Sequence, residues 1–140
     1  MIKIFTTSQQ KIGQRGEQIA LKYLISKDFE IVQRNYSTKD GEIDIIAIKD
    51  NVFYFIEIKT TLLRNSNVFD KNRYKPEYNV SREKLLKIKR CAETYVFEYN
   101  VSCETCFGVL LIEIDDKNNR SYIRFMGNII IENQASENEY

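Results

Sequence analysis

The stretch Glu42–Lys59, EIDIIAIKDNVFYFIEIK, decides the fold of this 140-residue chain. Two runs rich in β-branched and aromatic residues, 42–49 and 52–59, predict two strands. Only Asp50 and Asn51 separate the runs, and this spacing is typical of a two-residue β-hairpin. Because both runs are apolar on both faces away from their acidic ends, we expect them in the middle of a sheet that is covered on both sides.

The hairpin also predicts which charged side chains meet. With a loop of two residues, Asp44 falls opposite Glu57, and Glu42 falls opposite Lys59. Side chains alternate along a strand, and directly opposed residues point to the same side of the sheet. We therefore expect these four charged groups to converge on one patch at the open end of the hairpin.

Such a patch is costly for a purely structural protein. Opposed residues have Cβ atoms roughly 5 Å apart, and two carboxylates at that distance repel by ~3 kcal/mol at an effective dielectric constant of about 20. A divalent cation would turn this repulsion into ligation, and hard carboxylate oxygens suit Mg²⁺ or Mn²⁺. Lys59 would then hold an attacking water or neutralise charge on a phosphate. The spacing alone leaves ordinary salt bridges at the end of the sheet as an alternative.

The rest of the chain predicts an α-β-β-β-α-β-β order. Helical spacing covers residues 13–27, and a second helix begins after the N-cap Ser81 and runs to about residue 99. Further strands are predicted at 29–36, 107–115 and 121–131. We expect an α/β single domain over residues 1–132, in which helices flank a mixed central sheet, a long loop over 60–80, and a disordered acidic tail over 133–140.

Composition excludes several classes of site and location. The chain contains no His, which excludes Ser-His-Asp triads and His-ligated metal sites. No apolar stretch approaches the length of a transmembrane helix, so we expect no membrane partner. The residues before the first helix are too few for the apolar core of a secretory signal, so we expect a cytoplasmic protein with free thiols.

Charge is distributed unevenly along the chain. Residues 59–90 hold ten Lys or Arg and three Asp or Glu, a local net charge of +7, whereas residues 91–140 carry a net charge of −6. Such asymmetry indicates a face that meets a polyanion, although a solvated Lys-rich helix would explain it equally well. Beside a metal site, the candidate phosphate contacts are Arg73, Lys75, Arg82, Lys84 and Lys87.

Five short motifs also carry a family resemblance. They are GQRGE (13–17), RNY (34–36), GEIDIIA (41–47), FIEIK (55–59) and VSREK (80–84). Their order and spacing over about residues 11–131 resemble the bacterial YraN family, also called UPF0102, of predicted endonucleases. The pair GEID and IEIK resembles the D…(D/E)-x-K signature of restriction-endonuclease-like nucleases. Thr61 and Gly108 depart from the family pattern, where an Arg and an Asp are usual.

The resemblance implies a restriction-endonuclease-like fold that hydrolyses DNA phosphodiester bonds with Mg²⁺ or Mn²⁺, with branched or structured DNA among the candidate substrates. It implies Asp44 and Glu57 as metal ligands and Lys59 as the catalytic lysine. It also implies that Glu17 leans over the site as a further carboxylate ligand, as in archaeal Holliday-junction resolvases. The alternatives are a non-catalytic, structure-specific DNA-binding protein and an assembly module. DNA is the expected partner, and the sequence leaves open whether the protein forms a homodimer.

Overall fold

The computed structural model describes residues 8–63 and 80–127, and these contain two helices and five strands in the predicted order. The elements are α1 (Ser8–Ser26), β1 (Glu30–Thr38), β2 (Gly41–Lys49), β3 (Val52–Leu62), α2 (Arg82–Glu98), β4 (Glu104–Asp115) and β5 (Arg120–Met126). The class is therefore α/β, as predicted. Most of the predicted 60–80 loop and the predicted tail lie outside the described residues.

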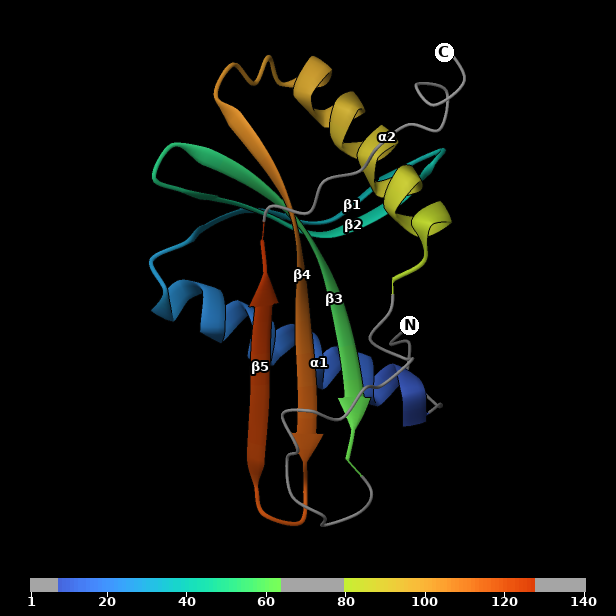
Figure 1. The fold of residues 1–140 in the computed structure, drawn as a ribbon, viewed down its shortest axis with the longest axis vertical. Helices are drawn as coiled ribbons and strands as arrows, with labels where there is room; N and C mark the ends of the chain where they lie inside the picture. Colours follow the sequence, from blue (N-terminus) through green and yellow to red (C-terminus); the bar gives the residue numbers. More distant parts are fainter. Residues whose placement is uncertain (1–7, 64–79, 128–140) are drawn as a thin grey trace, which may run out of the picture.

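The five strands form one mixed sheet in the order β1-β2-β3-β4-β5 (Figure 1). Strands β1, β2 and β3 pair antiparallel, β3 and β4 pair parallel, and β5 returns antiparallel to β4. The parallel pair requires a crossover connection, and the chain segment between β3 and β4 contains α2. Strands β2 and β3 therefore lie inside the sheet, which confirms the prediction made from their apolar faces.

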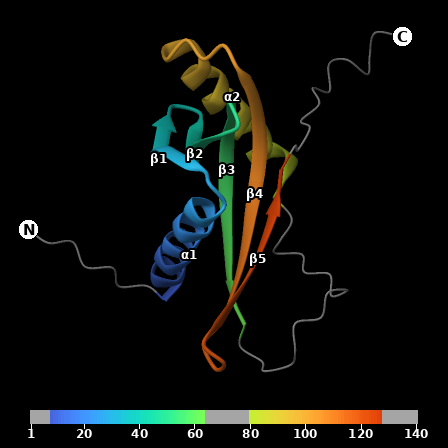
Figure 2. The same ribbon diagram turned by 90° about the vertical axis from the view of Figure 1, so that its left-hand side faces the viewer.

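The two helices pack on opposite faces of the sheet. Ala20 and Leu24 of α1 join one core cluster that includes Ile56 of β3. The next residue back, Phe55, belongs to a second cluster with Ile88 and other residues of α2. Because neighbouring residues of a strand point to opposite faces, the sheet separates the two clusters. In both views α1 lies along one half of the sheet and α2 lies near the other end, beside β1 and β2 (Figures 1 and 2).

The hairpin between β2 and β3 forms as its sequence predicts. Asp50 and Asn51 have φ angles of 49° and 62°, the left-handed values that a type I′ turn requires. The predicted register holds from Lys49 and Val52 back to the pair Ile45–Ile56. The predicted continuation of that register is wrong, because the β2–β3 ladder ends at this pair.

Helix α1 begins earlier than the predicted residue 13, and it contains Gly13 and Gly16. Gly16 is buried, and a Cβ placed on it would lie 1.9 Å from the Thr60 Oγ1 atom of β3. A glycine here allows the helix backbone to approach the strand closely. Gly13, by contrast, has no neighbouring atom within 4 Å of such a Cβ, so its place in the helix has no packing reason.

Helix α2 matches its prediction closely. Ser81 is its N-cap, and the Ser81 hydroxyl accepts a hydrogen bond from the Lys84 N–H at 3.1 Å.

The three cysteines, Cys91, Cys103 and Cys106, are free thiols. Within the described ranges, neither helix is long and apolar enough to span a membrane.

Candidate functional site

The candidate site lies where β2 separates from β3. Beyond Ile45, β2 stays paired with β1 as far as Gly41, while β3 stays paired with β4 as far as Leu62. Figure 1 shows the β1–β2 hairpin turning away from β3 toward α2. The two strands thus open a wedge inside a single sheet, and backbone groups on its walls lose their ladder partners.

Asp44 satisfies one of these backbone groups. Its Oδ2 atom accepts a hydrogen bond from the Ile58 N–H at 2.7 Å. The side chain of β2 thereby replaces a carbonyl that the diverging strand no longer offers. This bond holds the Asp44 carboxylate in the wedge, next to β3.

The Glu57 carboxylate lies beside that of Asp44. Glu57 is only 5% exposed, and it is one of two buried charged or polar residues in the described part of the chain. Burial and the neighbouring Glu57 carboxylate raise the pKa of Asp44 to about 7, although the Ile58 N–H opposes the shift. Two carboxylates therefore share one small, poorly hydrated space, and one of them holds a proton more readily than an ordinary aspartate does.

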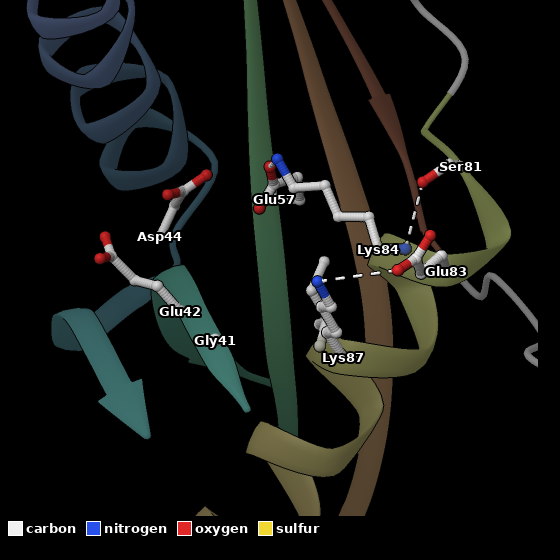
Figure 3. A pocket seen from close by; sticks show the side chains of 9 residues that line it. Gly41, Glu42, Asp44, Glu57, Ser81, Glu83, Lys84 and Lys87 are labelled. Carbon is white, nitrogen blue, oxygen red and sulfur yellow. Dashed lines mark hydrogen bonds and ion pairs between the residues drawn. The ribbon is translucent and has the colours of Figure 1, made fainter. Parts of the chain in front are cut away.

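Lys84 supplies a positive charge beside this pair. Its Nζ atom lies 2.5 Å from the Glu57 Oε1 atom. Burial lowers the pKa of Lys84, but the hydrogen bond to Glu57 and the charges of Glu57, Asp44 and Glu42 outweigh that effect, so the pKa is raised overall. Figure 3 shows the lysine reaching from α2 toward Glu57, opposite the two acidic side chains of β2. Lys84 is thus charged and electrostatically tied to the pair.

These side chains line a cavity of about 390 Å³. The lining residues come from β2, β3 and the first turns of α2: Gly41, Glu42, Asp44, Glu57, Ser81, Glu83, Lys84, Lys87 and Ile88. Carboxylates line one wall, and two lysines of α2 line the other (Figure 3). The cavity is therefore polar and presents both signs of charge.

Gly41 and Lys87 shape the side of the cavity where β2 starts. Gly41 has a φ of +149°, a conformation that side-chain-bearing residues rarely adopt. A Cβ at this position would lie 3.7 Å from the Lys87 Cβ atom. Lys87 itself pairs at 3.9 Å with Glu83, whose side chain is 83% exposed. This ion pair is therefore a solvent-exposed one, unlike that of Lys84.

The predicted Asp-Glu-Lys set is only partly gathered. Asp44 and Glu57 meet, although they are not a ladder pair. Lys59 lies two residues after Glu57 on β3, opposite Leu111 of β4, and strand alternation places it on the face of Glu57. It is not among the residues that line the cavity. Glu42 lines the cavity, but the predicted pairing of Glu42 with Lys59 is wrong, because β2 has left β3 before that point.

Glu17 is placed apart from the cavity lining. Its Oε1 atom lies 3.4 Å from a guanidinium nitrogen of Arg34 on β1, and the Glu17 side chain is 22% exposed. The same Oε1 atom is buried without a hydrogen bond. Glu17 thus retains an unsatisfied acceptor, and its predicted role as a ligand stays a prediction.

The predicted phosphate contacts fall into two groups. Three of them lie on the first two turns of α2 and are exposed to solvent: Arg82, Lys84 and Lys87. They form a basic edge next to the cavity. Arg73 and Lys75 lie outside the described residues.

The donor set fits a hard divalent cation in part. Asp44 and Glu57 offer carboxylate oxygens, the ligands that Mg²⁺ and Mn²⁺ prefer, and they line a cavity that has room for water ligands. Burial and the neighbouring Glu57 carboxylate raise the pKa of Asp44, and the charge of Lys84 opposes this shift without cancelling it. No group of three acidic, His or Cys side chains suited to a metal occurs within 8–63 and 80–127. The residues present would therefore supply two carboxylates to such a cation, and its other ligands would be water or substrate oxygens.

Sequence reasoning missed the place of Lys84. It counted the residue as one of several phosphate contacts, without relating it to the carboxylates. The VSREK motif and the Ser81 N-cap place Lys84 in the first turn of α2, but 27 positions separate it from Glu57. No periodicity relates two positions so far apart.

Comparison with known proteins gives a consistent match. The sequence profile of the uncharacterised protein family UPF0102 matches residues 16–114. A UPF0102 protein of Campylobacter fetus is 33% identical over 117 residues, which is 84% of this chain and 91% of that protein. One from Campylobacter lari is 38% identical over 78% of this chain and 89% of that protein. One from Helicobacter hepaticus is 34% identical over 72% of this chain and 83% of that protein.

Proposed function

Because the chain belongs to the UPF0102 family, whose description assigns no activity, we propose a function from its site: metal-dependent hydrolysis of phosphodiester bonds in DNA. One observation carries the proposal. Two adjacent carboxylates, Asp44 and Glu57, are held in a cavity whose opposite wall is a basic helix edge. A nuclease needs this combination of a site for a hard cation and groups that hold a polyanion.

The arrangement also supports a restriction-endonuclease-like fold for the domain. The element order α-β-β-β-α-β and the acidic positions on consecutive strands β2 and β3 are those that the D…(D/E)-x-K resemblance implies. The hairpin supplies both acids, and β3 adds Lys59 two residues later. All three residues thus come from β2 and β3, two interior strands of the sheet.

Each residue has a defined task in this proposal. Asp44 and Glu57 hold the cation, and the Ile58 N–H fixes the orientation of Asp44. A bound divalent cation would polarise the scissile phosphate and lower the pKa of a water ligand. Lys59 presents an N–H to that water or to a phosphate oxygen at the face of Glu57. Arg82 and Lys87 contact neighbouring phosphates without reading sequence.

The test is a cleavage assay with a panel of branched, flapped, single-stranded and duplex DNAs in Mg²⁺ and in Mn²⁺. We expect cleavage of at least one substrate by the wild type and none by Asp44→Asn. Cleavage that persists in Asp44→Asn, or that survives EDTA, would contradict the assignment of the site.

A second candidate is a non-catalytic, structure-specific DNA-binding protein with the same fold. It is favoured by the Lys84–Glu57 ion pair, which neutralises a carboxylate without any metal. This candidate predicts DNA binding with a steep salt dependence that EDTA does not change. Binding without cleavage in every metal would make it the better assignment.

A further inference from the structure

The Lys84 ammonium lies where the carboxylate pair needs a cation. Its Nζ atom is 2.5 Å from the Glu57 Oε1 atom, a charge-assisted contact with an oxygen that the proposed function assigns to the metal. A divalent cation on the same oxygen would lie next to the Lys84 ammonium, and the two cations would repel each other inside the cavity. The ammonium and the metal therefore compete for Glu57.

We propose that Lys84 is an exchangeable counter-cation: it neutralises the Asp44–Glu57 pair in the metal-free protein and withdraws when a divalent cation binds there. Lys84 thus competes with the metal for Glu57 and is neither a metal ligand nor a catalytic residue. The inference rests on the proposed function, because it needs a metal to bind at these carboxylates.

The two partners differ in how free they are to move. The Glu57 side chain is 6% exposed and belongs to an interior strand, whereas the Lys84 side chain is 53% exposed. A lysine has a flexible four-carbon stem, so its ammonium can turn toward solvent without moving its backbone. The buried glutamate stays in place, and the lysine is the partner that leaves.

The helix does not depend on this ion pair for its position. Ile88, Cys91, Ala92 and Tyr95 of α2 are buried in the core cluster on that face of the sheet. The start of the helix is fixed by the Ser81 cap, which uses the backbone N–H of Lys84 and not its side chain. The ammonium is therefore free to leave Glu57 while α2 stays docked.

Lys87 offers a matched comparison within the same cavity. It lies one helical turn after Lys84 and has a similar side-chain exposure, 52%. Its ion pair is with the exposed Glu83 and not with Glu57. Removing Lys87 thus removes one positive charge from the same cavity without vacating the carboxylate pair.

The withdrawal also reconciles two roles for Lys84. As long as its ammonium is tied to Glu57, it is a poor contact for a phosphate. Once a metal takes its place, the ammonium joins Arg82 and Lys87 on the basic edge of α2. Metal binding thereby adds one phosphate contact to the DNA-binding surface.

The experiment measures Mn²⁺ affinity by calorimetry for the wild type, Lys84→Met, Lys87→Met and Lys84→Arg, without DNA. We expect Lys84→Met to bind Mn²⁺ about tenfold more tightly than the wild type, a typical coupling between two sites. Lys87→Met should change the affinity by less than about threefold, because the Lys87 ammonium pairs with the exposed Glu83 and does not compete for Glu57. Lys84→Arg keeps a cation on Glu57 and should bind no more tightly than the wild type.

The effect of Mn²⁺ on thermal unfolding gives a second readout, because Mn²⁺ would not close the melting gap left by the loss of a purely structural lysine. In EDTA, Lys84→Met should melt below the wild type, because the buried glutamate loses its partner. Saturating Mn²⁺ should close that gap, since the metal then neutralises the pair in both proteins. If Lys84→Met does not fold, Lys84→Gln tests the same point, because its amide can still donate to Glu57.

The outcomes separate this inference from the proposed function. Equal Mn²⁺ affinity in the wild type and Lys84→Met, with a melting gap that Mn²⁺ leaves unchanged, would overturn the exchange and leave the metal site standing. Absence of Mn²⁺ binding in every variant would overturn both. Binding that appears only in Lys84→Met would support the exchange most strongly.

Discussion

The Asp44 carboxylate accepts a 2.7 Å hydrogen bond from the Ile58 N–H, across the point where β2 parts from β3. The bond fixes an acidic side chain beside Glu57 and satisfies a backbone donor of β3. The wedge between the two strands is thereby bridged by a hydrogen bond, but two carboxylates are placed next to each other. The predictions below follow from this arrangement and from the two helices that flank it.

Asp44→Asn should abolish Mn²⁺ binding, because it removes one of two carboxylates available to the cation. The amide oxygen can still accept the Ile58 N–H, so the variant should fold. Calorimetry measures the binding. Glu93→Gln, which removes an exposed carboxylate of α2 outside the cavity lining, is the control and should bind as the wild type does. Undiminished binding by Asp44→Asn would remove this site from consideration.

The stability of the metal-free protein should depend on the protonation of Asp44. Its pKa is raised from 3.8 to about 7 by burial and by Glu57, so the folded state favours the protonated form. The unfolded chain releases this proton near pH 4, and the folded state therefore loses stability relative to it as pH rises from about 4 to about 7.

Asp44→Asn lacks this titration. In EDTA it should match the wild type near pH 4 and exceed its free energy of unfolding at pH 8 by about 4 kcal/mol, because each unit by which the pKa is raised corresponds to about 1.4 kcal/mol. Urea denaturation across this pH range measures the difference. A difference that shrinks as pH rises would mean that Asp44 is ionised and favourably paired in the fold.

Replacing Lys84 and Lys87 together by Ala should weaken DNA binding to a similar degree for different sequences. Both lie on the basic edge of α2, and phosphate contacts carry no sequence information. The slope of log affinity against log salt should flatten by up to about two phosphate contacts. Fluorescence anisotropy at several salt concentrations measures it. The control is the pair Lys11 and Lys22, exposed on α1, whose replacement should leave the slope unchanged.

Lys59→Met should lose cleavage by orders of magnitude and keep both DNA and metal binding. The substitution keeps much of the aliphatic stem and removes an N–H that acts mainly in the transition state. DNA affinity is spread over other basic residues, and the carboxylates remain. Single-turnover cleavage and calorimetry on the same preparation separate these effects. Cleavage at the wild-type rate would show that the lysine serves only the charge balance of the sheet.

Gly16→Ala should destabilise the protein by about 1–3 kcal/mol, the usual cost of overpacking. In an exposed helix the same change would stabilise by up to about 1 kcal/mol, but here the new Cβ would meet Thr60 Oγ1 at 1.9 Å. Gly13→Ala is the control, because nothing lies within 4 Å of its Cβ, and it should be neutral or stabilising. Equal effects of the two changes in chemical denaturation would contradict the close approach of α1 to β3.

The sequence by itself determined the local features of this protein. The alternating apolar runs, the Asp50-Asn51 turn and the Ser81 cap predict the hairpin, its register near the turn and the helix α2, because each depends on neighbouring residues. The family resemblance also rested on short motifs of consecutive residues, and the match to the family profile confirms it. The predicted start of α1 at residue 13 is wrong, because the helix begins at Ser8, and the close packing of Gly16 against Thr60 is likewise decided by the fold.

The tertiary structure alone decided how the site is assembled. The alternation of side chains along two strands does not show where their pairing ends. In the folded sheet, β2 stays paired with β1 and β3 stays paired with β4, so the β2–β3 ladder ends at Ile45 and Ile56. The packing of α2 against the sheet brings Lys84 to Glu57, across 27 positions of sequence. The charges around the carboxylates come from residues of different elements that lie far apart in the sequence. Their balance therefore cannot be predicted from the spacing of residues along one strand.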